Sequence, residues 1–155
     1  LFEQYLPIAD KPRRALIEWL PEFFFKTEEG TWRPPNDDEE RQVKAGLRAS
    51  GVLRRIKRFA NALAEGVPPA PRDAPGNPAT QADWIYLCRR AGLYDLGRIL
   101  YEKGGLRFDG LEEELQLQVE EDYQICVRRS EKKAEKKKRK GKKTGQLELG
   151  LEEEA

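Results

Sequence analysis

Apolar residues along most of this chain recur at intervals of three and four, which predicts a mainly α fold of five or six helices. A short helix is expected after Pro12, and Pro21 should end it. The clearest repeat is the stripe of Leu53, Ile56 and Phe59. Comparable stripes predict the remaining helices at residues 36–49, 52–64, 80–91, 94–103 and from about 109 to 129.

One segment, between residues 23 and 33, departs from the helical spacing and predicts a β-hairpin. The Phe23–Phe25 run and Trp32 are strong β formers, and Gly30 marks a turn between them. A helix followed by a hairpin resembles the edge of a winged-helix domain, although two strands can equally form a plain cap over a helical core. We interpret these aromatic residues as core residues rather than as a platform for stacking bases.

A Pro-rich segment divides the chain. Residues 67–79 contain five prolines and no aromatic residue, which is typical of an extended linker or surface loop. We therefore expect a helical lobe with the hairpin at 1–66, and a helical hairpin plus one long helix at 80–129. Residues 130–155 lack the apolar content of a core, so they predict a disordered tail that is Lys-rich and then acidic.

Charge is strongly segregated, although the net charge of the 155-residue chain is only +1. The stretch 41–63 has seven basic residues and no acid, whereas 109–122 has seven acids and no base. The densest block is 128–143, which holds eleven Lys and Arg against two Glu. Such a block cannot build a core, so it must lie in water or on a polyanion.

The residue types present exclude most catalytic sites. The chain has no His, which removes the commonest general base, the His-dependent triads and Cys/His zinc sites. No glycine-rich phosphate loop occurs, and consecutive carboxylates such as Glu112–Glu114 point in different directions on a helix. We therefore expect no enzymatic activity, no cofactor and no metal in this chain.

Two observations bear on the compartment. Cys88 and Cys126 lie in separate apolar-periodic segments, which predicts reduced core thiols rather than a disulfide. No apolar run approaches the ~20 residues of a membrane span. Together they favour a cytoplasmic protein. The chain also contains no Met, even at position 1, which favours a fragment of a longer protein over a processed start.

Two basic segments are the candidate nucleic-acid contacts. Arg54, Arg55, Lys57 and Arg58 lie beside or opposite the apolar stripe of the expected 52–64 helix, where guanidinium groups can match phosphate oxygens. The alternatives are pairing with the acidic helix after Asp109, or simple solvation. The second segment would serve as a nucleic-acid arm, a solvating tail or a nuclear-targeting-like cluster, and its candidates are Lys132, Lys133, Lys136, Lys137, Lys138, Arg139, Lys140, Lys142 and Lys143.

Three stretches carry a family resemblance: SGVLRRIKRF at 50–59, DWIYLCRRAGLY at 83–94 and VEEDYQIC at 119–126. They resemble the C-terminal accessory region of large prokaryotic adenine-specific DNA methylases and phage-defence proteins, over about residues 12–129. The resemblance implies a non-catalytic piece of a DNA-methylation or defence protein that helps position DNA or a partner subunit. Such methylases hold the target amine with an Asp/Asn-Pro-Pro-Tyr tetrapeptide. Here Asn77-Pro78-Ala79-Thr80 departs from it, so no catalytic residue carries over.

The resulting hypothesis is a non-catalytic nucleic-acid-binding accessory module, with DNA as the expected partner. A protein–protein interaction module within a multi-subunit complex, whose lysines only solubilise it, is the alternative. The spaced leucines that follow Gln146 also resemble short peptides that dock on DNA sliding clamps.

Overall fold

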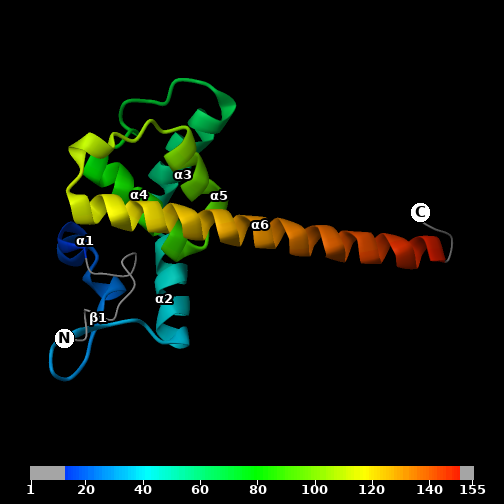
Figure 1. The fold of residues 1–155 in the computed structure, drawn as a ribbon, viewed down its shortest axis with the longest axis horizontal. Helices are drawn as coiled ribbons and strands as arrows, with labels where there is room; N and C mark the ends of the chain where they lie inside the picture. The colour runs from blue at the N-terminus through cyan, green and yellow to red at the C-terminus, as the bar shows by residue number, and fades with distance from the viewer. Residues whose placement is uncertain (1–12, 151–155) are drawn as a thin grey trace.

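The computed structural model describes residues 13–150, with side chains described at residue 13 and from 16 to 136. Within this range the fold is mainly helical, with one antiparallel two-stranded hairpin (Figure 1), as the apolar spacing predicts. The elements in order are α1 (Arg14–Trp19), η3 (Pro21–Phe23), β1 (Phe25–Lys26), β2 (Trp32–Arg33), α2 (Asp37–Arg48), α3 (Gly51–Glu65), α4 (Pro78–Ala91), α5 (Tyr94–Glu102), η4 (Phe108–Gly110) and α6 (Glu113–Gly150).

Helix α4 is the centre of the fold, because it is buried on nearly every side. Ile85, Tyr86 and Cys88 are each fully buried, and α4 packs against α2, α5 and α6. The helix begins at Pro78, where the Asn77 side chain caps it by accepting the Thr80 N–H at 2.8 Å. Asn77 and Pro78, the two residues that this segment shares with the methylase tetrapeptide, therefore serve as a helix start.

A single hydrophobic core includes residues from both sides of the Pro-rich segment. Phe59 of α3 meets Trp84 of α4 edge-on, with ring centroids 5.9 Å apart, and Val119 of α6 belongs to the same cluster. The segment at 67–79, expected to separate two lobes, thus connects two parts of one core. Cys88 and Cys126 are both buried and free, as predicted for core thiols.

The hairpin caps α4. Phe25 pairs with Arg33 and Lys26 with Trp32, and Gly30 supplies the positive φ of 88° that the turn requires. Phe24, just before β1, stacks on Tyr86 of α4 with a centroid separation of 6.3 Å. The hairpin therefore acts as a cover over the helical core, which is the second of the two interpretations the sequence allowed.

Helix α6 runs without interruption from Glu113 to Gly150 and projects far beyond the rest of the fold (Figure 1). Among the α6 side chains that the structure describes, up to residue 136, the buried ones include Asp122, Cys126 and Ser130, and none lies beyond Ser130. The segment from residue 130, predicted as a Lys-rich tail outside the core, continues α6 as helical backbone as far as Gly150. Lys, Arg, Glu and Gln are good helix formers, which suits this backbone.

None of the helices between residues 13 and 150 combines the length and the apolar character that crossing a membrane would require.

Candidate nucleic-acid interface

Two of the four basic side chains predicted on α3, Arg55 and Arg58, bind other parts of the fold, and Arg55 does so in its interior. Arg55 is half-buried, donates from Nη2 to the carbonyl oxygen of Ala74 at 2.7 Å, and holds its guanidinium 5.1 Å from the Trp84 ring centroid. It therefore fastens the Pro-rich segment to the core. The prediction of Arg55 as a phosphate contact is not supported by this geometry, because its donors and its ring contact are directed inward.

Arg58 is also engaged, but at the surface. Its Nε lies 3.1 Å from a carboxylate oxygen of Asp73, whose side chain is buried while that of Arg58 is 56% exposed. The acid that pairs with α3 thus comes from the Pro-rich segment and not from the acidic helix after Asp109, the partner weighed from sequence. Asp73 accordingly reduces the positive charge that Arg58 presents.

Arg54 and Lys57 are exposed and remain directed outward. Within the described part of the chain, neither side chain makes an ion pair or a hydrogen bond. Of the four predicted residues on α3, these two present exposed cationic groups whose donors are available to a phosphate.

The first half of the α6 tract forms a basic face. Because an α-helix turns about 100° per residue, its five described basic side chains fall within an arc of about 140°. Glu131 and Glu135, the two acids between 128 and 143, lie outside that arc. The five are all exposed: Arg128, Arg129, Lys132, Lys133 and Lys136.

The rest of the tract continues on the same helical backbone. Its candidate side chains lie outside the described residues, and they are Lys137, Lys138, Arg139, Lys140, Lys142 and Lys143.

Two further basic residues, which sequence reasoning did not select, lie at the base of this face. Arg48 of α2 donates from Nε to the carbonyl oxygen of Ala91 at 2.9 Å, and Lys44 also approaches the turn at Gly92. The same turn borders a surface hollow lined by Lys133 of α6, together with Asp95. The end of α2 and the start of the tract therefore meet at the α4–α5 turn.

A buried ionic cluster fixes α6 to the core. Asp122 is fully buried and pairs with Arg13 and with Arg89, the latter at 2.8 Å. Arg13 also lies 3.6 Å from Asp83 of α4. Burial raises the pKa of Asp83 to about 6, an effect that the charge of Arg13 opposes.

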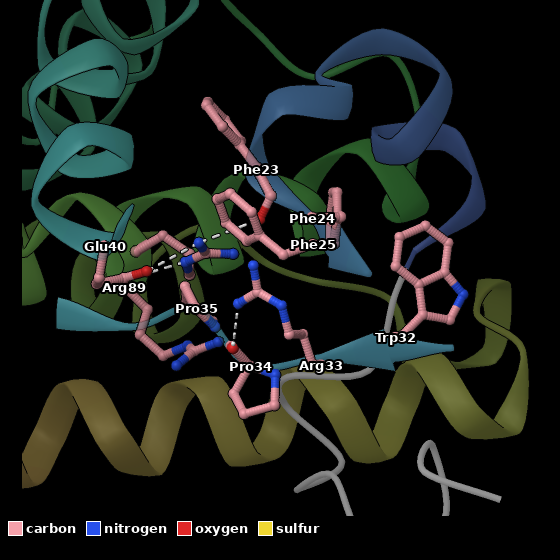
Figure 2. Close-up of a pocket in the computed structure, with 10 residues that line it drawn as sticks. Phe23, Phe24, Phe25, Trp32, Arg33, Pro34, Pro35, Glu40 and Arg89 are labelled. Carbon is pink, nitrogen blue, oxygen red and sulfur yellow. Dashed lines mark hydrogen bonds and ion pairs between the residues drawn. The ribbon is translucent and has the colours of Figure 1, made fainter. Parts of the chain in front are cut away.

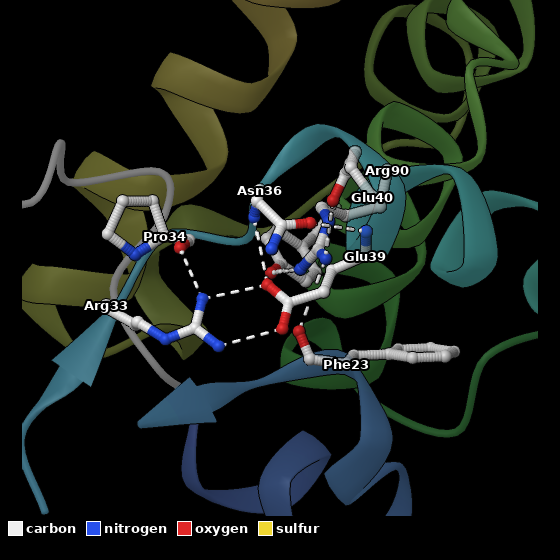
Figure 3. A network of polar contacts seen from close by, with 8 residues as sticks. Phe23, Arg33, Pro34, Asn36, Glu39, Glu40 and Arg90 are labelled. Atoms are coloured by element: carbon white, nitrogen blue, oxygen red, sulfur yellow. Dashed lines mark hydrogen bonds and ion pairs between the residues drawn. The ribbon is translucent and has the colours of Figure 1, made fainter. Parts of the chain in front are cut away.

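A second polar network joins α2, α4 and the hairpin (Figure 3). Arg90 donates to both carboxylate oxygens of Glu40, at 2.9 and 3.2 Å, to the Phe23 carbonyl at 3.2 Å and to the Tyr86 hydroxyl at 2.6 Å. Arg33 forms a bidentate pair with Glu39, with both contacts at 2.8 Å.

The Arg33 pair is coupled to the start of α2. The hydrogen bond from Arg33, followed by the backbone N–H of Asn36, lowers the pKa of Glu39 to about 2. Glu39 and Asn36 also form a reciprocal capping box at this helix end. Arg33 thus ties strand β2 to the first turn of α2.

These two networks border a pocket of about 230 Å³ between the hairpin, α2 and α4 (Figure 2). Sequence reasoning assigned the aromatic residues of this region to the core. Phe23 is buried, but the side chains that line the pocket include the half-buried rings of Phe24, Phe25 and Trp32. Its polar lining comes from Arg33, Glu40, Arg89 and Arg90.

No family model, curated protein or solved structure matches this chain. Among the residues that the structure describes, no group of three or more His, Cys, Asp or Glu side chains is arranged to hold a metal ion. Function has to be inferred from the chain's own side chains, and the largest outward-facing concentration of like charge described above is the basic face of α6.

Proposed function

We propose that this chain is a nucleic-acid-binding accessory module that acts without chemistry of its own, as part of a larger DNA-modification or phage-defence protein. The observation that carries the proposal is the basic face of α6. Its five cations are exposed on one arc of a helix that projects from the core, where a phosphate backbone can reach them.

The arrangement favours contact with a phosphate backbone over simple solvation. Like charges at neighbouring turns of a helix repel one another, so a basic arc costs stability in the free protein. A polyanion removes that repulsion when it binds, whereas water only screens it. Lys44 and Arg48 at the base of the arc and Arg54 and Lys57 on α3 would enlarge the positive surface.

The expected strength follows from counterion release. Neutralising five phosphates gives a salt slope of about −4.5, at roughly 0.9 per phosphate, so affinity should fall roughly 500-fold between about 50 and about 200 mM salt. Binding of this kind carries no base sequence preference, because backbone contacts position a protein without reading sequence.

The test is a fluorescence-anisotropy titration of the full chain with a short DNA duplex at both salt concentrations. The combined variant Lys132→Gln, Lys133→Gln and Lys136→Gln should lower the magnitude of the slope by about 2.7. A matched control neutralises three exposed cations elsewhere, as Arg72→Gln, Lys103→Gln and Arg107→Gln, and should leave the slope nearly unchanged. Equal effects of the two triple variants would show that only total charge matters.

The alternative function, a protein–protein interaction module, is favoured by a different surface. Trp19 of α1 is 64% exposed and Leu117 of α6 is 52% exposed, and a partner that covered them would remove this apolar surface from water. Failure of the intact chain to bind duplex DNA at low salt would refute the nucleic-acid proposal and leave this alternative.

A further inference from the structure

The pocket between the hairpin, α2 and α4 presents aromatic faces held in fixed orientations. The Phe24 ring lies edge-on to the Trp32 ring, with centroids 6.2 Å apart and an interplanar angle of 79°. It also stacks on the Tyr86 ring, with an interplanar angle of 4°. The guanidinium of Arg33 lies 5.3 Å from the Phe25 ring centroid. Aromatic rings and guanidinium planes are the surfaces on which unstacked nucleobases pack.

The charges around the pocket are already balanced, which argues against a phosphate or another small anion as its ligand. Arg33 is paired with Glu39, and Arg90 is paired with Glu40. Arg89, the remaining cation of the lining, is paired with the buried Asp122. A neutral planar group with hydrogen-bonding edges suits such a pocket better than an ion does.

The pocket also offers partners for the edge of a base. The side chain of Glu40 is 35% exposed although both of its oxygens accept from Arg90. Each carboxylate oxygen has a second lone pair, so Glu40 can accept from the exocyclic amino group of a base. The guanidinium of Arg33, 30% exposed, lies on the same lining, and the second N–H of its Nη2 remains available.

The size of the pocket limits what it can hold. At about 230 Å³ it is smaller than the roughly 300–1,000 Å³ of pockets that enclose drug-sized ligands. One planar ring system is therefore the appropriate occupant, with the sugar and phosphate left outside.

The pocket lies close to the basic face of α6. Arg89, in the pocket wall, contacts Asp122 of α6, and Figure 2 shows α6 running alongside the residues of the lining. Lys132 lies ten residues further along the same helix, which corresponds to about 15 Å at 1.5 Å per residue. That distance spans about four or five nucleotides of a duplex strand at 3.4 Å per nucleotide.

We propose that this pocket takes one unstacked nucleobase from the nucleic acid that binds along α6. This inference rests on the proposed function. The base packs against the Phe25 ring and the Arg33 guanidinium and directs an amino group toward Glu40, while the neighbouring phosphates lie on the basic face. The chain then prefers nucleic acid with a bulged or single-stranded nucleotide over a continuous duplex.

The test compares two duplexes of equal charge in titrations of the full chain. One duplex carries a single bulged adenine, and the other carries an abasic analogue at the same bulge. The intact chain should bind the bulged adenine more tightly by roughly 5- to 150-fold, the range expected for stacking of one base. Because the phosphates are unchanged, the salt slopes of the two duplexes should be equal.

Variants assign the preference to the pocket. Phe25→Leu should abolish it, whereas Phe25→Tyr, which keeps a ring, should retain most of it. Trp19→Leu, at an exposed tryptophan that does not line the pocket, is the matched control and should retain all of it. Circular dichroism melts of each variant verify the fold, and the comparison of the two duplexes with the intact chain requires no variant.

The outcomes separate the two proposals. Equal affinity of the intact chain for both duplexes would overturn the pocket inference while leaving binding along α6 intact. A preference that survives in Phe25→Leu would also overturn it, because the base would then bind elsewhere. If neither duplex binds at low salt, the proposed function itself fails.

Discussion

Removing the carboxylate of Asp122 should be among the most destabilising single changes in this fold. The side chain is fully buried, and it pairs with Arg13 before α1 and with Arg89 on α4. In Asp122→Ala both guanidinium groups stay in the core without their shared acid. The side chains of Arg13 and Arg89 are only 4% and 13% exposed, so water cannot readily replace it.

The magnitude follows from the cost of leaving charge uncompensated. Breaking a buried pair by removing one partner costs about 3–5 kcal/mol, against a total stability of about 5–15 kcal/mol for a typical domain. Asp83, which lies 3.6 Å from Arg13, offsets part of that loss at neutral pH. We therefore expect a loss of about 3 kcal/mol, and a fall in Tm of about 6–12 °C.

Urea denaturation followed by circular dichroism measures this loss. Asp109→Ala is the matched control, because Asp109 and its partner Arg107 are both 76% exposed, and a surface pair of that kind contributes ~0–1 kcal/mol. A loss for Asp122→Ala no larger than that of Asp109→Ala would refute the reasoning. Replacing Asp122, Arg13 and Arg89 together by Leu, Met and Met should restore much of the stability, since apolar residues often substitute for buried ion pairs.

Gly97→Ala should lower the free energy of unfolding by about 1–3 kcal/mol, because the added Cβ would lie 2.6 Å from Cys126 Sγ. Gly46→Ala in α2, whose added Cβ would have nothing within 4 Å, should raise the free energy of unfolding by about 0.5–1 kcal/mol in the same urea titration. Asp83 binds its proton more readily in the folded state, where its pKa is about 6, than at its ordinary value of 3.8. Protonated Asp83 therefore stabilises the fold below about pH 4, and the free energy of unfolding should fall as pH rises from about 4 to about 6. Asp83→Asn should remove that fall in urea titrations across this range. Asn36→Ala should cost about 1 kcal/mol and lower the Tm, because it deletes one half of the α2 capping box, and no loss would mean that the box adds nothing.

Much of the helical layout could be predicted from sequence, because local spacing and capping residues determine it. Gly66 and Gly92 end α3 and α4 in the left-handed conformation that glycine tolerates, and Asn36 caps α2. The central position of α4 was harder to foresee, since its polar residues suggested an exposed side. Arg90 is in fact buried, with its charge compensated by Glu40.

The contacts that decide the site could not be predicted, because they join residues far apart in the sequence. Arg13 and Asp122 are separated by 109 positions, and Glu40 and Arg90 by 50. Even the shorter separation of Arg58 and Asp73, 15 positions, spans the Pro-rich segment, whose path the composition does not reveal. Charge counts identified which segments are basic but not which of their side chains are already paired.

Half-buried aromatic residues are a second feature that the sequence pattern cannot predict. An apolar pattern shows that a side chain avoids water, but not whether it fills the core or borders a hollow. Phe23, Phe25 and Trp32 all border the pocket, yet Phe23 is buried whereas Phe25 and Trp32 are half-buried, and the apolar pattern does not distinguish them.

Because α6 is one continuous helix, the packing of its buried residues on the core fixes the direction in which its basic residues face. Ser130, held by Arg98 of α5 at 3.0 Å, is the last buried residue before the projecting portion. Two residues inserted after it would swing the cations around the axis by about 200°, to the opposite side. Four would turn them by only about 40° and advance them by about 6 Å. The number of residues inserted therefore sets both the direction in which the basic side chains face and their distance from the core.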